Sequence, residues 1–169
     1  MTADPPQTPV TVRPATLDDV DAVVAMVAEV AGEGRWIATE APVDVDQRRR
    51  RMVEDVEREE AIVLVAEAGG QVVGELGLYL ARYGVADLGM AVAAGWRGRG
   101  VGSALVAEAV ARARAAGAHK IALQVWPHNR AAIALYERFG FQVEGRLRRH
   151  YRRRSGELWD AILMGLPLD

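Results

Sequence analysis

The chain has 169 residues, of which half are apolar, and a formal net charge of -2 at pH 7. This length suits one hydrophobic core rather than two, and the small charge gives no general attraction to nucleic acid or to an anionic membrane. Cysteine is absent and the three histidines are scattered, which excludes disulfides, thiolate nucleophiles and the usual zinc sites. We therefore expect one metal-free cytoplasmic domain over residues 10–169.

The N-terminal third predicts one strand and two helices. Residues 1–9 are polar and carry three prolines, which favours a disordered lead-in over a signal peptide, and no apolar run is long enough to span a bilayer. A short strand is expected at 10–13, a helix capped by Thr16 up to about residue 31, and a second helix from Asp44. The arginine run 48–51 of that helix is expected to face solvent. The loop 32–42 between the helices carries Trp36, which would form a wall of a substrate pocket or a dimer contact.

The rest of the chain predicts mainly strands, with two helices between them. Ranges 61–68 and 71–81 are rich in β-formers and are separated by Gly69-Gly70, a two-residue hairpin turn. A third strand is expected at 85–92, then a helix at 103–116, a strand at 121–125, a helix from Asn129 to Phe139, and a final hairpin over 141–151 and 158–166. This order predicts a single mixed α/β (α+β) domain.

A glycine-rich turn joins the third strand of this series to its helix. It contains Arg97-Gly98-Arg99-Gly100-Val101-Gly102 and is followed by Ser103. Backbone N–H groups and a helix dipole can converge on an anion such as a diphosphate at this position, and glycine allows the close approach. A Walker loop is excluded because no Lys-Ser or Lys-Thr follows, and the dinucleotide fingerprint fails because its sixth position is not glycine. A tight turn without a ligand remains the alternative.

A second motif, about thirty residues later, supports the ligand-binding interpretation. Residues 129–141 follow the pattern N-x-x-A-x-x-L-Y-x-x-x-G-F, and the first motif follows Val92 in the form Arg/Gln-x-x-Gly-x-Gly/Ala. Both motifs, in this order, resemble the GNAT superfamily of N-acetyltransferases, and the resemblance extends over about residues 10–166. It implies a twisted mixed sheet, splayed beside the glycine turn and flanked by about four helices, and acetyl-CoA as cosubstrate.

The resemblance also implies roles for individual residues. Backbone groups of Met90, Ala91 and Val92 would contact the pantetheine arm and the thioester carbonyl, and the amides from Gly98 to Ser103 would hold the diphosphate, with charge added by Arg97 and Arg99. Asn129 would either bind the pantetheine or act only as a helix N-cap.

Attack of an amine on a thioester requires a base for the amine and an acid for the leaving thiolate. The resemblance implies Tyr136 as the acid, although a buried tyrosine can equally be a core aromatic. Some N-terminal acetyltransferases of the superfamily carry a glutamate where this chain has Gln124, which cannot accept a proton. We expect Asp87 or Glu75 to serve as the base instead, directly or through water, against the alternative of a solvated strand acid. His128 and His150 are expected to be structural.

The sequence leaves the acceptor open. We expect a primary amine, in a small molecule or amino acid; the alternatives are a protein N-terminus or lysine, and a non-catalytic regulator that binds acetyl-CoA. The tail of the chain resembles those of amino-acid and ribosomal-protein N-terminal acetyltransferases. The six arginines of the final hairpin are expected to be solvated and balanced by Glu144, Glu157 and acids elsewhere in the chain, although a subset could bind a substrate carboxylate. RNA binding there is disfavoured by the overall charge. These arginines are Arg146, Arg148, Arg149, Arg152, Arg153 and Arg154.

Overall fold

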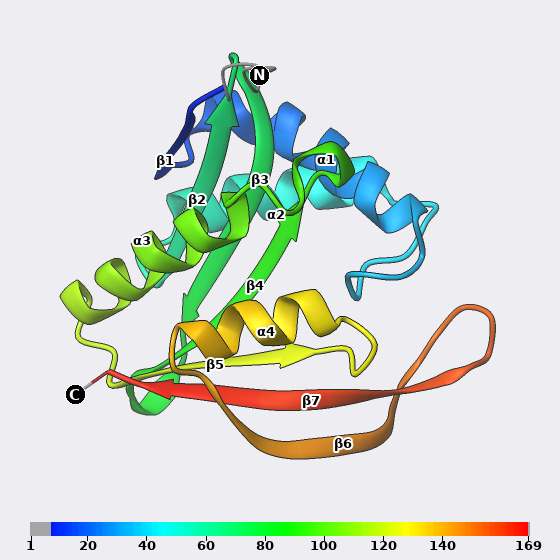
Figure 1. Ribbon diagram of the computed structural model, residues 1–169. Helices are drawn as coiled ribbons and strands as arrows, with labels where there is room; N and C mark the ends of the chain where they lie inside the picture. Colours follow the sequence, from blue (N-terminus) through cyan, green and yellow to red (C-terminus); the bar gives the residue numbers. More distant parts are fainter. Residues whose placement is uncertain (1–7, 169) are drawn as a thin grey trace, which may run out of the picture.

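One seven-stranded sheet organises the protein, and the computed structural model describes residues 8–168 (Figure 1). Neighbouring strands are antiparallel, except for β4 and β5, which run parallel. The order across the sheet is β1-β2-β3-β4-β5-β7-β6. The strands are β1 (Val10–Pro14), β2 (Ala61–Ala68), β3 (Gln71–Leu80), β4 (Val85–Val92), β5 (Lys120–Val125), β6 (Gln142–Arg152) and β7 (Leu158–Pro167).

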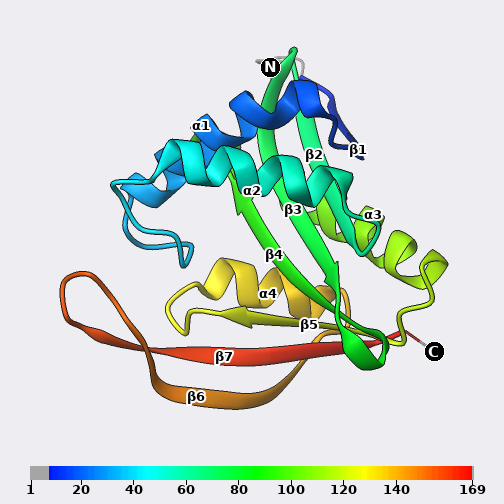
Figure 2. The ribbon, with the colours of Figure 1, turned by 180° about the vertical axis from the view of Figure 1, so that it is seen from behind.

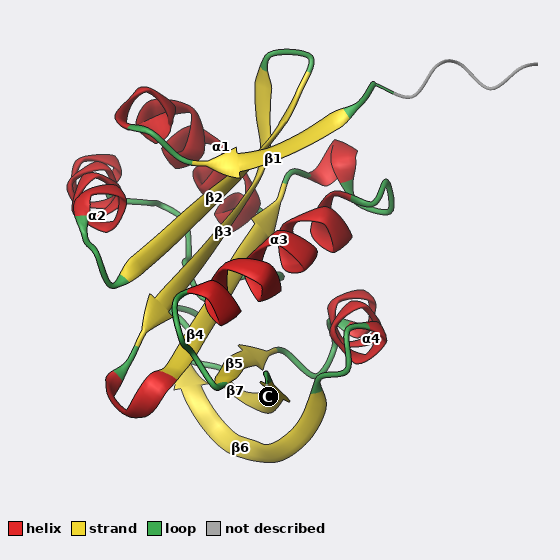
Figure 3. Ribbon diagram, turned by 90° about the vertical axis from the view of Figure 1, so that its left-hand side faces the viewer, coloured by secondary structure: helices red, strands yellow, loops and turns green. Residues whose placement is uncertain are grey.

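Four helices cover the two faces of this sheet. Helices α1 (Val20–Gly32) and α2 (Val45–Glu57) lie on one face, and α3 (Val101–Ala115) and α4 (Arg130–Arg138) lie on the other (Figures 2 and 3). Because side chains alternate along each strand, each face has its own apolar cluster. Leu64, Leu76 and Leu105 belong to the cluster beneath α3, whereas Val65 and Met52 belong to the cluster beneath α1 and α2.

The sheet opens between its two parallel strands. The pairing of β4 with β5 covers only Val85–Leu88 against Lys120–Leu123. Beyond Leu88, β4 stays paired with β3 as far as Val92, while β5 stays paired with β7 as far as Val125. The sheet therefore splits into a half with β1–β4 and a half with β5–β7, and the predicted splayed architecture is confirmed.

Several local predictions needed correction. Thr16 precedes a 3₁₀ turn at Leu17–Asp19 rather than the α-helix itself, and α3 starts two residues earlier than expected, at Val101. Arg48 is half-buried rather than solvated, because α2 turns this arginine toward the sheet. Of the expected lead-in 1–9, residues 1–7 lie outside the described residues. No helix within residues 8–168 is long and apolar enough to cross a membrane.

Candidate active site

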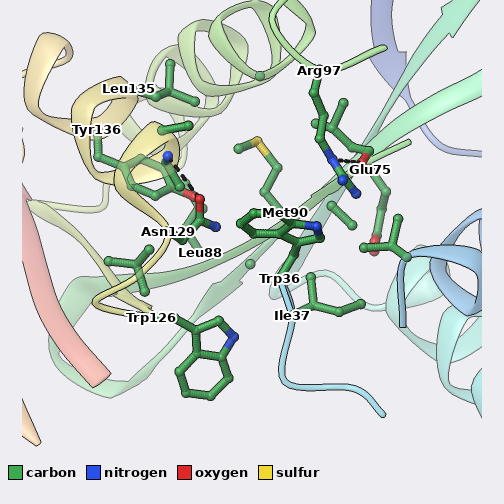
Figure 4. Close-up of a pocket in the computed structure, with 18 of the residues that line it drawn as sticks. Trp36, Ile37, Glu75, Leu88, Met90, Arg97, Trp126, Asn129, Leu135 and Tyr136 are labelled. Carbon is green, nitrogen blue, oxygen red and sulfur yellow. Dashed lines mark hydrogen bonds between the residues drawn. The ribbon is translucent and has the colours of Figure 1, made fainter. Parts of the chain in front are cut away.

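A cavity of about 740 Å³ occupies the opening between β4 and β5. Its lining comes from both faces of the sheet, since it includes Met90 and Tyr136 on the α3–α4 face and Glu75 and Ala91 on the α1–α2 face. In the view of Figure 4, Asn129 and Tyr136 lie on one side of Met90, and Glu75 and Arg97 lie on the other. Two molecules entering from opposite faces can therefore meet beside β4.

The backbone of β4 presents hydrogen-bonding groups to this cavity. Ala93 N–H donates to Val73 O on β3 at 2.9 Å, so the alternation of an antiparallel pair turns the N–H and C=O groups of Met90 and Val92 away from β3, toward the opening. The carbonyl of Val92 already accepts a hydrogen bond from Arg97 Nε at 3.1 Å. The N–H of Val92 and both backbone groups of Met90 remain available for a ligand.

The glycine-rich turn forms an open cradle at the start of α3. Gly98 and Gly100 adopt φ values of +71° and +81°, and a Cβ at either position would meet no other atom within 4 Å. Both glycines line the cavity, as do Gly102 and Ser103. The side chain of Val101 is buried in the core, so only its backbone can serve a ligand. A concave row of amides at a helix N-terminus fits a diphosphate.

The two arginines of this turn have different surroundings. Arg97 donates from both Nη atoms to the carboxylate of Glu33 at 2.7 Å, and these bonds lower the pKa of Glu33. Its guanidinium also lies 5.4 Å from the ring centre of Trp36. Because each of its three guanidinium nitrogens donates to a group within the protein, Arg97 joins the α1–α2 loop to β4. Arg99 is exposed and stacks on Trp96 at 5.3 Å, which leaves its charge accessible to an anion.

Helix α4 contributes an amide and a phenol to the cavity. Asn129 Oδ1 accepts the N–H of Ala132 at 3.2 Å, so Asn129 is the N-cap of α4, while its amide nitrogen can still donate to a ligand. Tyr136 is 6 % exposed and packs against Phe141, with ring centres 5.5 Å apart. Burial raises the pKa of Tyr136, so its phenol stays protonated across the physiological range. The tyrosine is thus both a core aromatic and a cavity-lining O–H group.

The strand register places a small hollow on the α1–α2 face. Gly77 of β3 lies opposite Gly89 of β4, and a Cβ at Gly89 would meet no other atom within 4 Å. The neighbouring pairs on the same face are Glu75 with Ala91 on one side and Tyr79 with Asp87 on the other. The two candidate bases therefore lie on the same face of the sheet, on either side of this glycine pair, and the ring of Tyr79 covers Gly77 between them.

The two acids differ sharply in their surroundings. Glu75 is 7 % exposed and lines the cavity, and burial raises the pKa of its carboxyl group. Asp87 is exposed, and it is not among the described residues that line the cavity, because β4 carries it past the hollow to the rim. Geometry consequently favours Glu75 over Asp87 for direct contact with an acceptor.

Aromatic side chains line the cavity on the β5 side. Trp126 is buried and meets Tyr151 edge-on, with ring centres 4.9 Å apart. Tyr151 donates its hydroxyl proton to Gln124 Oε1 at 2.6 Å, and all three residues line the cavity. Gln124, which replaces the glutamate of some N-terminal acetyltransferases, therefore has a partner within the protein. His128 lies outside this wall and contacts the carbonyl of Arg35 through Nε2 at 2.8 Å.

The hairpin of β6 and β7 is fastened to the α1–α2 loop. Arg153 is only 5 % exposed, donates to Ala38 O at 3.1 Å and stacks 4.4 Å from the ring centre of Trp159. The backbone N–H of Arg154 donates to the carboxylate of Glu40. The prediction of a fully solvated basic hairpin is thus wrong for Arg153, which this contact buries.

The expected charge balance of the hairpin is confirmed for acids elsewhere in the chain and wrong for Glu144. Asp160 pairs with Arg146 at 2.7 Å, and Glu40 faces Arg153 at 3.4 Å. Glu144, which was expected to balance the arginines, pairs with Lys120 instead. The balancing acids thus come from the opposite strand and from the α1–α2 loop.

Comparison with known proteins agrees with the geometry of this cavity. The model of the acetyltransferase (GNAT) family matches residues 28–141, which include both motifs and strands β2 to β5. The chain belongs to the acetyltransferase (GNAT) family. It is accordingly an N-acetyltransferase that uses acetyl-CoA as the acyl donor, and the open glycine cradle fits the diphosphate of that donor.

Three similar proteins cover nearly the whole chain. The L-methionine sulfoximine/L-methionine sulfone acetyltransferase of Pseudomonas aeruginosa is 26 % identical, with 94 % of both chains covered. The ribosomal-protein-alanine N-acetyltransferase of Brucella melitensis has a TM-score of 0.85 and 31 % identity, over 94 % of this chain and 99 % of that one. The protein yncA of Salmonella typhimurium, solved with its cofactor acetyl-CoA, shares the fold, with a TM-score of 0.82, 24 % identity, and 95 % and 94 % of the two chains covered.

Sequence reasoning missed several residues that line the active-site cavity. Arg48, Tyr79, Trp126 and Tyr151 lie outside the two motifs, and tertiary packing alone brings them to the cavity. Only Arg48 carried a usable pattern: it precedes the apolar Met52 by one helical turn, which places both residues on the same face of α2.

We expect Gly98→Val to weaken coenzyme A binding on the order of tenfold or more, because its side chain would occupy the cradle and its positive φ would be strained. The strain itself should lower the free energy of unfolding by about 1–2 kcal/mol. Isothermal titration with coenzyme A measures the binding. Gly117→Val is the matched control, because Gly117 has a positive φ of +79° and also faces open space but lies outside the cavity lining. Equal affinity in the two variants would remove the cradle from the diphosphate site.

Proposed function

We propose that the protein acetylates the amino group of a small primary amine, in particular a free amino acid. The observation that carries this proposal is the cavity through the sheet, which places a buried carboxylate, Glu75, and a protonated phenol, Tyr136, on either side of the β4 backbone. The donor would occupy the α3–α4 side, where Gly98 to Ser103 and Asn129 lie, and the acceptor would occupy the α1–α2 side.

The α1–α2 loop favours a small acceptor over a protein. Contacts of Ala38 with Arg153 and of Glu40 with Arg154 join this loop to the β6–β7 hairpin, and Arg154 also donates to Pro42 O at 3.1 Å. These bonds bridge the acceptor side of the opening, where an extended peptide would need to lie. The activity of the Pseudomonas relative on amino-acid derivatives agrees with this proposal.

Each reacting proton has a candidate partner. Acetyl-CoA supplies a thioester, whose acetyl group passes to the amine while the thiol leaves. Glu75 would take one of the two protons that the nitrogen loses, and Asp87 at the rim would pass it to solvent. The other proton, lost after the nitrogen attacks the carbonyl, would replace the one that Tyr136 gives to the sulfur. The N–H of Val92, whose backbone faces the opening, would stabilise negative charge on the acetyl oxygen, and Tyr136 would donate a proton to the sulfur.

An acceptor panel tests the proposal directly. With acetyl-CoA as donor, we expect free thiol to be released with one or more L-amino acids at least about tenfold faster, in kcat/KM, than with peptides bearing N-terminal alanine or with Nα-blocked lysine. A thiol-reactive dye measures the release. Preference for the peptide would assign the protein to modification of protein N-termini. Coenzyme binding without turnover of any acceptor would support the non-catalytic alternative.

Replacement of Tyr136 by Phe should lower kcat roughly 10- to 100-fold, because it removes the proton donor and keeps the buried ring against Phe141. The dissociation constant for coenzyme A should change by less than about twofold, since the phenol is not assigned to donor binding. Steady-state kinetics and calorimetry give the two values. An unchanged kcat would leave Tyr136 with a packing role only.

The pH dependence of kcat/KM should identify the base. A general base works in its ionised form, so the rate should rise with pH through the pKa of Glu75, which burial has raised above the usual glutamate value. Glu75→Gln should abolish this acidic limb and lower kcat/KM about 100-fold or more. Asp87→Asn should keep the limb, with a loss of about tenfold or less. The reverse ranking would assign the base to Asp87.

A further inference from the structure

We propose that Arg48 binds the α-carboxylate of a free amino acid while Glu75 holds its ammonium group, so that the two side chains together select a zwitterion. This inference rests on the proposed function, because it concerns the acceptor side of the same cavity. It specifies the acceptor as an α-amino acid with a free carboxyl group, as opposed to an amine without one.

The bonding capacity of Arg48 is largely unmet. Helix α2 directs its side chain to the cavity, where Nη2 lies 3.4 Å from Glu75 Oε1. A charge-assisted hydrogen bond is normally about 2.7–2.9 Å long, so this contact is weak. The Nε atom is buried and has no hydrogen-bond partner among the described residues. A carboxylate bound edge-on would satisfy two donors of this guanidinium at once.

Glu75 likewise lacks a strong cationic partner. Its carboxylate is buried, and this burial raises its pKa; Arg48 opposes the shift, and the nearby carboxylate of Asp55 adds to it. Asp55 accepts the hydroxyl proton of Tyr79 at 2.9 Å, and among the described residues no ion pair joins it to Arg48. Arg48 and Glu75 therefore offer one positive and one negative group, side by side and weakly joined. A zwitterion supplies the complementary pair without adding net charge to the cavity.

The register of the sheet fixes the orientation of such an acceptor. Glu75 lies opposite Ala91, between the two residues whose backbone groups face the opening, Met90 and Val92. An amine held at Glu75 would therefore be next to the part of β4 assigned to the thioester (Figure 4). The open space above Gly89 lies beside it and would receive the Cα atom and the start of the side chain.

Arg48 stands where the active-site cavity meets a second, polar cavity. This second cavity, of about 830 Å³, shares Ala38, Thr39, Arg48 and Tyr79 with the first. Arg51 and Arg154 are among its other lining residues. The lining of the second cavity also includes the acids Glu40, Asp44, Glu54 and Asp55, so its charge is mixed. A carboxylate at Arg48 would thus lie where the acceptor site meets this polar cavity, away from the reacting carbonyl.

The test compares matched acceptors that differ only in the carboxylate. The kcat/KM values of the wild type, Arg48→Gln and Arg48→Lys are measured with each L-amino acid and with its carboxamide, which keeps the α-amine. We expect the wild type to prefer the acid over the amide on the order of 30- to 100-fold, and Arg48→Gln to bring this ratio close to one. Arg48→Lys should give an intermediate ratio, because lysine keeps the charge without the bidentate geometry.

The ratio of kcat/KM for the acid to kcat/KM for the amide separates a loss of carboxylate recognition from a general loss of activity. Any effect of Arg48 on the pKa of Glu75 changes both kcat/KM values alike. The different basicities of the two amines change the ratio by the same factor in every variant, so they cancel when variants are compared. Arg49→Gln is the control, because Arg49 is an exposed neighbour on α2 outside both cavities, and it should leave the ratio unchanged. Coenzyme A affinity reports folding, and Arg48→Lys carries the test if Arg48→Gln is unfolded.

Two results would overturn the proposal: a wild-type enzyme that acetylates acid and amide equally well, or an Arg48→Gln variant that keeps the preference. An enzyme that acetylates only peptides or lysine would also overturn it, while leaving the N-acetyltransferase activity intact. Failure to release thiol with any amine would instead refute the proposed function itself.

Discussion

The site depends on the point where β4 and β5 stop pairing. Two parallel strands that remained bonded to their ends would fill the space that the cavity occupies, and the backbone groups of Met90 and Val92 would be used within the sheet. Because the strands part after Leu88, those groups need partners that the protein does not fully supply. A ligand with amide and carbonyl groups of its own satisfies these backbone groups. The place where β4 and β5 are not paired therefore becomes a binding site.

The sequence predicted the fold well, and it located the residues that we propose for the donor side, because both are encoded locally. Hydrophobic alternation located the strands, and the two motifs located the glycine cradle, Asn129 and Tyr136 within short segments. The acceptor side was predicted poorly. Arg48 and Glu75 are 27 residues apart, and the hydrogen bond of Arg153 to Ala38 spans 115 residues. Such contacts arise from the packing of separate elements, and no periodicity within a segment indicates them.

The position of an arginine in a sequence motif did not predict which groups its guanidinium contacts. Arg97 belongs to the diphosphate motif, yet its guanidinium holds Glu33 and the carbonyl of Val92. Arg153 belongs to the most basic stretch of the chain, yet it is buried between tryptophans. Conversely, Arg48, in a run expected to be solvated, is half-buried beside the cavity. The partners of an arginine, which only the tertiary structure shows, decide its role.

The α1–α2 loop has a consequence for how the enzyme can diversify. Glu33 joins one end of the loop to β4 through Arg97, and Glu40 joins the other end to the β6–β7 hairpin. The loop therefore links the two halves of the split sheet. Its middle residues, Trp36 to Thr39, also line the cavity. A mutation that reshapes the acceptor pocket here will also change the spacing of the halves that grip the donor. Acceptor choice and donor affinity are thus expected to evolve together in this protein.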